Sequence, residues 1–399
     1  MASHVPSTDR DTLQPEVHHR RLSNRILQLQ YLLPALMLLF IATDIVLRFT
    51  SLDWLTFRGL EASWVRFPGS DGPFTPNKVY FNPVSYGDLA SISNLPQFRE
   101  VHPALFRTDD HGFHNPPDYA AHLPAAGILT GDSFSINAEV PEDQTLSALL
   151  GKALGGFVYN AADDRPLSAW AYAGLAKRLG MSHGIVIVEL LERQDAAEVT
   201  RRLGENSSLA RKIGQQRWVN LYRILLNQVR FSPITAIAKR LEKTLENDRI
   251  LPNGFASAVE IKKLRNGLDI LLLPPFPPAA AGKAQRWSDY FSRLRQQLAG
   301  ENLDLVVALV PEKRTTYAPL FNEPPEDDAG AAYLNDLEAK LRIENIKVVN
   351  LLDPLRRLAK EELSRGNLVF WRDDTHWNAR GIKLASEKIA EALRTREPR

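Results

Sequence analysis

The stretch GILTGDSFS at residues 127–135 decides the fold class. Its first part, Gly127–Thr130, has the length and composition of a strand that is buried on both faces. Ligands of an open parallel sheet bind beyond the carboxyl ends of the strands, and Ser133 closely follows such an end. A serine at this place can use neighbouring backbone N–H groups to stabilise an oxyanion. Ser133 is therefore a candidate nucleophile, and the alternative is an ordinary turn serine that caps a helix.

Further apolar runs indicate buried strands, and helical patterns separate them. The runs cover residues 157–159, 185–190, 305–310 and 346–351, and residues 269–273 are a candidate for a further strand. Leu146, Leu150 and Leu154 share one face of a predicted helix, and Ile382 and Ile389 share a face of the last one. Strands that alternate with helices predict a parallel sheet covered on both sides. We therefore expect a three-layer α/β/α sandwich with a five-stranded parallel sheet in the order 2-1-3-4-5.

The composition excludes several classes of function. The chain has 399 residues, of which 44% are hydrophobic, so a large buried core can form. Its formal net charge is only +2, without the basic excess that a nucleic-acid-binding surface requires. The absence of cysteine excludes disulfides, thiolate metal sites and a cysteine nucleophile. No glycine-rich nucleotide-binding motif occurs in the sequence, and we expect neither a metal nor a cofactor.

The apolar run at residues 26–47 predicts a transmembrane anchor. As a helix it would be about 33 Å long, enough for a hydrocarbon core of roughly 30 Å. Arginines lie on both sides of the run, with a weak excess before it. The excess favours a cytoplasmic tail at residues 1–25 and a C-terminal domain in the periplasm. A buried core helix and a cleaved signal peptide are the alternatives, although no clear small-residue cleavage site follows the run.

The rest of the chain divides into a connector and one large domain. Residues 48–100 are rich in aromatic residues, Gly and Pro and lack a sustained helical period. They indicate a connector that packs onto the main domain, residues 101–399. A helical insertion rich in Arg and Lys interrupts this domain at about residues 196–266. Its charges form a solvated face or, alternatively, bind an acidic polymer or lipid headgroups.

A second motif, RDDTHWN at residues 372–378, lies just before the last predicted helix. A serine nucleophile needs a base, and the base needs a carboxylate that fixes its tautomer. Histidine suits the role of base because its pKa lies near neutrality. His376 has two aspartates close before it, and its loop lies at the same edge of the predicted sheet as Ser133. This coincidence favours a catalytic pair over a surface turn.

The sequence offers two adjacent carboxylates, Asp373 and Asp374, as the partner of His376. In extended backbone, side chains two residues apart point the same way, which pairs Asp374 with the histidine. In a helical turn, residues three apart are neighbours, which pairs Asp373 with it. Asn378 has the character of a helix N-cap, so the preceding residues should be extended. We therefore predict that Asp374 orients His376 and that Asp373 is solvated or paired with Arg372.

Together these motifs resemble the SGNH/GDSL hydrolase superfamily. GDSF and DTHWN carry the resemblance, and the segments FRTDDHGFHNP, VIVELLER, ALVPEKRTTY and DDTHWNARG resemble its alginate O-acetyltransferase-like branch. The resemblance covers about residues 101–395. It implies an SGNH-type fold and a catalytic triad made of Ser133, His376 and Asp374.

The chain departs from this pattern in two ways. In the alginate-like branch the D-x-H-W motif usually precedes the serine, whereas here the serine comes first, so an alginate substrate does not follow. The superfamily also supplies a Gly and an Asn for its oxyanion hole. Here the matching blocks read YNAAD, without the Gly, and ELLER, without a G-x-N-D motif. The Ser133 N–H can supply one oxyanion donor. Arg193 is a candidate to stabilise the oxyanion as a fixed cation, and the alternative is a structural pair with Glu192. Candidates for oxyanion or substrate contacts are Asp132, Asn160, Arg193, Lys313, Tyr317 and Asp373.

The resemblance implies an O-acetyltransferase that acts on an exported polysaccharide through an acyl-enzyme. A multipass membrane acyltransferase would supply the acetyl group, and the protein would lie in the cytoplasmic membrane with its domain in the periplasm. The same triad in an acetyl-esterase is one alternative. A catalytically idle subunit that binds or assembles polysaccharide is another.

Overall fold

The computed structural model describes residues 31–47, 72–74, 76–82, 85–93, 95–163, 169–195, 259–275, 281–323 and 328–394, with five single positions between 234 and 245. Residues 31–47 are helical, and residues 26–30 of the predicted anchor lie outside the described part. Within the described ranges, no helix is both long and apolar enough to cross a membrane.

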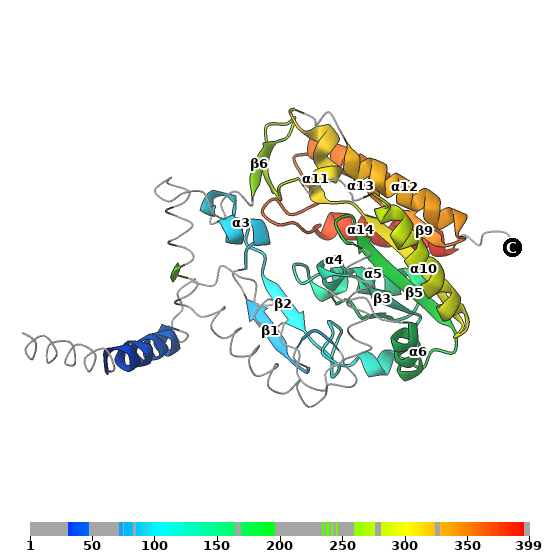
Figure 1. Ribbon diagram of the computed structural model, residues 1–399, viewed down its shortest axis with the longest axis horizontal. Helices are drawn as coiled ribbons and strands as arrows, with labels where there is room; N and C mark the ends of the chain where they lie inside the picture. The colour runs from blue at the N-terminus through cyan, green and yellow to red at the C-terminus, as the bar shows by residue number, and fades with distance from the viewer. Residues whose placement is uncertain are drawn as a thin grey trace, which may run out of the picture.

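A five-stranded sheet forms the centre of the molecule (Figure 1). Its strands are β3 (Gly127–Thr130), β4 (Val158–Asn160), β5 (Gly184–Leu191), β8 (Leu303–Val310) and β9 (Lys347–Asn350). Their spatial order is β4-β3-β5-β8-β9, and every neighbouring pair is parallel. The predicted parallel sheet and its order 2-1-3-4-5 are therefore confirmed.

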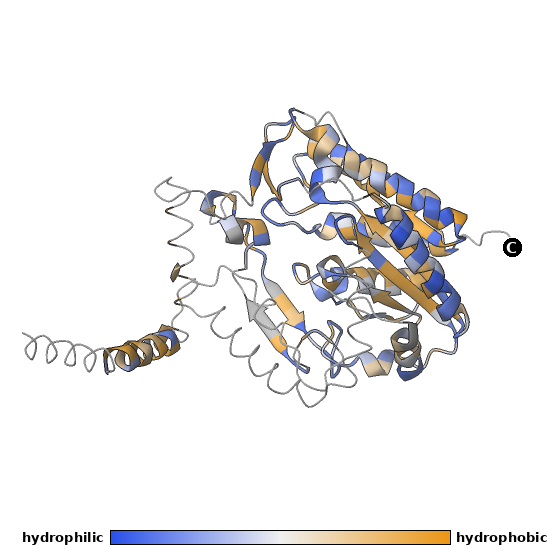
Figure 2. Cartoon of the chain, in the orientation of Figure 1, coloured by the Kyte–Doolittle hydropathy of each residue, from blue (hydrophilic) through white to orange (hydrophobic). Residues whose placement is uncertain are grey.

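Helices cover both faces of this sheet and complete three layers. Alternate strand residues such as Val186 and Val307 pack with one set of helices, and Ile187 and Ala308 pack with the other. The first set is α6 (Ala169–Arg178), α10 (Lys283–Ala299) and α12 (Ala329–Ile343), and the second is α5 (Leu146–Leu154), α13 (Leu352–Ser364) and α14 (Ala379–Arg394). Figure 2 shows hydrophobic central strands and helices that mix hydrophobic with hydrophilic residues, the pattern of half-buried helices.

Two small antiparallel sheets lie outside the central one. The first pairs β1 (Val79–Asn82) with β2 (Ala104–Arg107), and the second pairs β6 (Glu260–Lys263) with β7 (Asp269–Leu272). The strand expected near residue 269 therefore exists, but it pairs with β6 and not with the central sheet. The helical prediction is wrong for β6. Most of residues 196–258 lie outside the described part of the chain.

Three short helices position polar side chains near one edge of the central sheet. Helix α4 (Ser133–Ile136) follows β3, helix α11 (Lys313–Tyr317) follows β8, and helix α3 (Asp88–Ser93) comes from the predicted connector. Because the carboxyl ends of parallel strands meet at one edge, α4 and α11 lie at the same edge. The loop between residues 371 and 377, just before α14, completes the group.

Candidate active site

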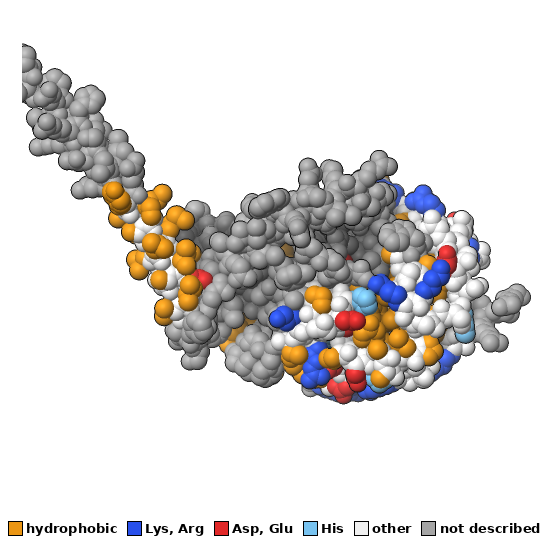
Figure 3. Space-filling view, turned by 90° about the horizontal axis from the view of Figure 1, so that it is seen from below, with side chains coloured by type: hydrophobic (Ala, Val, Ile, Leu, Met, Phe, Trp, Pro, Cys, Tyr) orange, Lys and Arg blue, Asp and Glu red, His pale blue; other side chains and the backbone are white. Residues whose placement is uncertain are grey.

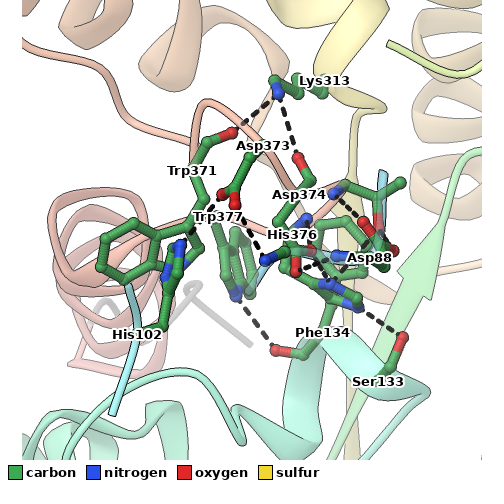
Figure 4. Close-up of polar contacts among 12 residues, drawn as sticks. Asp88, His102, Ser133, Phe134, Lys313, Trp371, Asp373, Asp374, His376 and Trp377 are labelled. Atoms are coloured by element: carbon green, nitrogen blue, oxygen red, sulfur yellow. Dashed lines mark hydrogen bonds and ion pairs between the residues drawn. The ribbon is translucent and has the colours of Figure 1, made fainter. Parts of the chain in front are cut away.

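Ser133, His376 and Asp374 form one chain of hydrogen bonds (Figure 4). The Nε2 atom of His376 lies 2.7 Å from the Oγ atom of Ser133, across 243 residues of sequence. Its Nδ1 atom lies 2.5 Å from the Oδ1 atom of Asp374. This order of nucleophile, base and acid is the arrangement that activates a serine. The geometry agrees with the expected pairing, and the catalytic role of the three residues stays a prediction.

The turn that carries Ser133 is built on two acidic residues. The Asp132 carboxylate caps α4 by accepting the Phe134 N–H at 2.9 Å. Beneath it, the Oε2 atom of Glu189 accepts the Asp132 N–H at 3.0 Å and the Ser135 hydroxyl at 3.3 Å. A Cβ atom on Gly131 would lie 2.3 Å from that same oxygen, so the turn requires glycine. Burial, and then the charge of Asp132, raise the pKa of Glu189 well above its ordinary value.

The loop that carries His376 is closed by backbone pairing. Phe370 and Trp377 form an antiparallel bridge, and the Trp371 N–H donates to the His376 carbonyl at 3.0 Å. The Asn378 side chain accepts the Arg380 N–H at 2.9 Å, which is the expected N-cap contact of α14. The loop is not helical, and this explains why the two-residue spacing, and not the three-residue spacing, brings a carboxylate to the histidine.

Asp373 has a different environment from the one predicted. It is neither solvated nor paired with Arg372, because its side chain is fully buried and its Oδ1 atom lies 2.9 Å from the Nε2 atom of His102. Its Oδ2 atom accepts the N–H groups of Gly87 at 2.9 Å and Glu100 at 3.0 Å. Arg372 instead donates to a backbone carbonyl of β7 and lies over the ring of a phenylalanine.

The predicted connector also contacts the carboxylate of Asp374, the partner of His376. The Asp88 N–H donates to the Oδ2 atom of Asp374 at 3.0 Å. The Asp88 carboxylate in turn accepts the backbone N–H of Thr375 at 2.8 Å and its hydroxyl at 2.6 Å. These contacts join residues more than 280 positions apart, and no local sequence motif predicts them.

Lys313 is buried, and carbonyl oxygens surround it. Its ammonium lies 2.7–3.0 Å from the carbonyls of Leu271, Trp371, Arg372 and Asp374. Burial lowers the pKa of Lys313 to about 8. The side chain therefore fixes the histidine loop against β7, and its ammonium shows no hydrogen bond to Ser133 among the described residues.

The hydroxyl of Tyr317 also supports the segment that leads into the histidine loop. The Tyr317 ring is fully buried, and its oxygen accepts the Val369 N–H at 2.8 Å. Asn160 similarly braces the nucleophile turn, since its Nδ2 atom donates to the Ser135 carbonyl at 2.8 Å. Its Oδ1 atom accepts the Ala162 N–H at 3.0 Å. Both candidates thus contact the backbone that holds the site.

Arg193 pairs with Glu312 and not with Glu192. Its Nη1 atom lies 2.9 Å and 3.2 Å from the two carboxylate oxygens of Glu312. Burial raises the pKa of Glu312 to about 7, against the lowering effect of the guanidinium. Glu192 instead accepts the Glu312 N–H and the Thr315 hydroxyl. The predicted pair of Arg193 with Glu192 is therefore wrong, and the partner of Arg193 is Glu312.

Comparison with known proteins finds a family resemblance over the C-terminal part of the chain. Residues 276–399 match the family model described as "SGNH hydrolase-like domain, acetyltransferase AlgX". This stretch, which includes the loop of His376, is similar to SGNH hydrolase-like domains of the acetyltransferase type. The resemblance expected from the sequence is thereby confirmed.

The curated relatives match over short segments. The chain is 30% identical over 105 residues to "Probable alginate O-acetylase AlgJ" from Pseudomonas fluorescens, which covers 26% of each chain. Proteins of the same name from Pseudomonas putida and Azotobacter vinelandii are 29% identical over 100 residues and 27% identical over 122 residues. These matches cover 25% and 30% of each chain, so the chain spans less than a third of the relatives it matches.

A cavity of about 490 Å³ lies beside the loop that carries His376. Thr375, the neighbour of His376, lines it together with the Arg193–Glu312 pair. Apolar residues such as Leu89 and Phe321 line it as well. A volume of this size lies within the range of roughly 300–1,000 Å³ that is typical of small-molecule sites.

Two groups of described side chains have the composition of metal sites. One contains Asp88, Asp374 and His376, and the other contains Glu100, His102 and Asp373. In both groups a histidine nitrogen lies at hydrogen-bond distance from a carboxylate, and backbone N–H groups occupy a second carboxylate oxygen. The contacts are those of hydrogen-bonded pairs, and we assign no metal to either group.

Proposed function

We propose that this protein is an O-acetyltransferase that moves an acetyl group to a hydroxyl of an exported polysaccharide. Ser133 is the nucleophile, His376 the general base and Asp374 the acid that orients the base. One observation carries the proposal, namely the continuous chain of hydrogen bonds from Asp374 through His376 to Ser133. The half-buried Ser133 stands at the start of α4, where its own N–H can stabilise an oxyanion.

The reaction would proceed in two halves. First, the Oγ atom of Ser133 attacks the acetyl carbonyl carbon, and its proton passes to the Nε2 atom of His376. The bond to the donor oxygen breaks, that oxygen takes the proton from His376, and acetyl-serine remains. Second, a sugar hydroxyl attacks the acetyl-serine and gives its proton to His376. The acetylated sugar leaves, and the returned proton restores the Ser133 hydroxyl.

The cavity beside Thr375 is the site that we propose for the sugar acceptor. Its apolar residues can pack against the face of a sugar ring, while the Arg193–Glu312 pair offers donors and acceptors for hydroxyl groups. Transfer requires that a hydroxyl of the acceptor attacks the acetyl-serine faster than water does, although water is present at about 55 M. Good orientation gives effective molarities of about 10⁵ M or more, so a positioned acceptor can react faster than water.

The purified protein, incubated with an aryl acetate donor and candidate glycans, tests the proposal. Acetate release and acetylated glycan are measured separately. Ser133→Ala should lower both by roughly three orders of magnitude or more, with little change in melting temperature. Ser182→Ala, at an exposed serine, is the matched control and should behave as the wild type. If Ser133→Ala retains more than about a tenth of the rate, Ser133 is not the nucleophile.

The same assay separates the alternatives. Acetate release that no glycan diverts into an acetylated product would indicate an acetyl-esterase. A wild-type protein that binds glycan but neither releases nor transfers acetate would indicate an idle binding or assembly subunit. Either result contradicts the transferase proposal.

We also propose that residues 26–47 anchor the protein in the cytoplasmic membrane, with residues 48–399 in the periplasm. The described part of this segment exposes its large apolar side chains (Figure 3), among them Tyr31 at 73%, Leu38 at 67% and Leu33 at 64%. A multipass membrane acyltransferase would then be the acetyl donor. A reporter that is active only in the cytoplasm, fused after Arg399, should be silent, and strong activity there would overturn this orientation.

A further inference from the structure

Asp88, Thr375 and His376 form a second hydrogen-bonded chain that ends on the triad histidine. The Oδ2 atom of Asp88 lies 2.6 Å from the Thr375 hydroxyl, and that hydroxyl lies 3.3 Å from the Nδ1 atom of His376. Thr375 is 5% exposed and His376 is 2% exposed, so water competes little for these contacts. The chain reaches the nitrogen opposite to the one that faces Ser133 (Figure 4).

The chemistry of these groups fixes the direction of each hydrogen bond. A carboxylate only accepts, so the Thr375 hydroxyl donates its one proton to Asp88. The threonine oxygen therefore presents a lone pair to the Nδ1 atom of His376. Asp374 presents an acceptor to the same nitrogen. Both neighbours favour a proton on Nδ1, and this leaves the lone pair on Nε2 toward Ser133.

Asp88 contacts both of these acceptors. Besides holding the Thr375 hydroxyl, it accepts the Thr375 N–H at 2.8 Å and donates its own N–H to Asp374 at 3.0 Å. One residue of α3 thus binds both partners of Nδ1. Holding a catalytic group within a fraction of an ångström matters, because a displacement of about 1 Å can cost roughly a hundredfold in rate.

We propose that Asp88 and Thr375 are positioning residues that set the tautomer and orientation of His376. Asp88 acts on His376 through Thr375 and Asp374. The predicted connector therefore supplies part of the active site. This inference rests on the proposed function, because it concerns the same histidine.

Three variants test the proposal through kcat and KM measured separately. Thr375→Val keeps the shape of the side chain but removes the hydroxyl, and Asp88→Asn keeps the shape but weakens the acceptor. Each should lower kcat by roughly ten- to a hundredfold, with KM changed by less than about twofold. Thr375→Ser restores the hydroxyl and should return kcat to within about threefold of the wild type. A merely structural role would not produce this rescue.

Thr316→Val is the matched control for removal of a buried threonine hydroxyl. Thr316 is fully buried, and its hydroxyl has no hydrogen-bond partner among the described residues, so kcat should stay unchanged. The double variant of Asp88→Asn and Thr375→Val should lose no more than the worse single variant, since the two residues act in one chain.

The outcomes separate this inference from the proposed function. Wild-type kcat in both Asp88→Asn and Thr375→Val, with Ser133→Ala inactive, overturns only the positioning role. A Thr375→Ser enzyme as slow as Thr375→Val also overturns it, because the hydroxyl would then be irrelevant. An active Ser133→Ala overturns the proposed function itself.

Discussion

Asp373 binds His102, with 2.9 Å between its Oδ1 atom and the Nε2 atom of the imidazole, although 271 residues separate the two in the chain. The next residue, Asp374, binds the other histidine of the site, His376. The two neighbouring carboxylates therefore serve different partners, and their removal should affect different properties of the protein.

Replacement of each aspartate by asparagine should distinguish catalysis from stability. Asp374→Asn should lower kcat by roughly three to four orders of magnitude, because the histidine loses the acceptor that fixes its tautomer. Asp373→Asn should lower the rate by less than about tenfold. It should nevertheless reduce the free energy of unfolding by roughly 1–3 kcal/mol, since a buried acceptor of several hydrogen bonds is weakened. Initial rates and urea denaturation measure the two effects, and the reverse ranking of rates would assign the orienting role to Asp373.

The His102–Asp373 pair predicts a pH dependence of stability. Burial disfavours the charged imidazole, but the Asp373 carboxylate outweighs it, so that the pKa of His102 is raised. A histidine whose pKa is raised on folding contributes its full stabilisation at pH values below the unfolded-state pKa of about 6.5. This contribution is lost as the pH rises through the folded-state pKa. The free energy of unfolding should therefore contain a component that falls above about pH 6.5. In His102→Gln this component should be absent, and an unchanged slope would contradict the assignment.

Glu189 predicts a second dependence on protonation. Because burial raises its pKa, the protonated acid is favoured in the folded state, and the ionised form at higher pH opposes folding. Glu189→Gln resembles the protonated acid in shape and charge, so it should fold with near wild-type stability and gain stability relative to the wild type as pH rises. Glu189→Ala should lose roughly 1–3 kcal/mol, because it leaves the Asp132 N–H without its acceptor. Thermal denaturation between about pH 5 and pH 9 compares the three proteins.

Two buried tyrosines form a matched pair for testing hydroxyl contacts. The Tyr317 oxygen accepts the Val369 N–H, so Tyr317→Phe should cost roughly 1–3 kcal/mol of unfolding free energy. The Tyr333 hydroxyl is buried and has no hydrogen-bond partner among the described residues, so Tyr333→Phe should be neutral or stabilising. Equal losses in the two variants would show that the contact with Val369 contributes little.

Local patterns predicted the frame of the site well. Gly127–Thr130 is a strand over its whole predicted length, and the order of the five strands follows from the alternation of strands and helices. The Asn378 cap correctly placed the start of α14 and hence the non-helical loop before it. These features depend on neighbours in sequence or on the general rules of parallel sheets.

Contacts between distant segments could not be predicted in the same way. Asp88 belongs to a segment without a helical or strand period of its own, and His102 lies just after that segment. Each binds a loop more than 270 residues later. Arg193 has a glutamate beside it in sequence, yet it pairs with Glu312 at the end of the neighbouring strand β8. A single sequence shows which residues can pair, but the packing of strands and loops decides which of them meet.

The close packing of Gly87 against the histidine loop has a practical consequence for shortened forms of the protein. A Cβ atom at this position would lie 2.2 Å from the Asp373 carbonyl oxygen, so no side chain fits between the two segments. A recombinant form that starts at residue 101, the boundary suggested by the strand–helix alternation, would lack the N–H groups of Gly87, Asp88 and Glu100. Expression of the catalytic unit for biochemistry should therefore start upstream of residue 85.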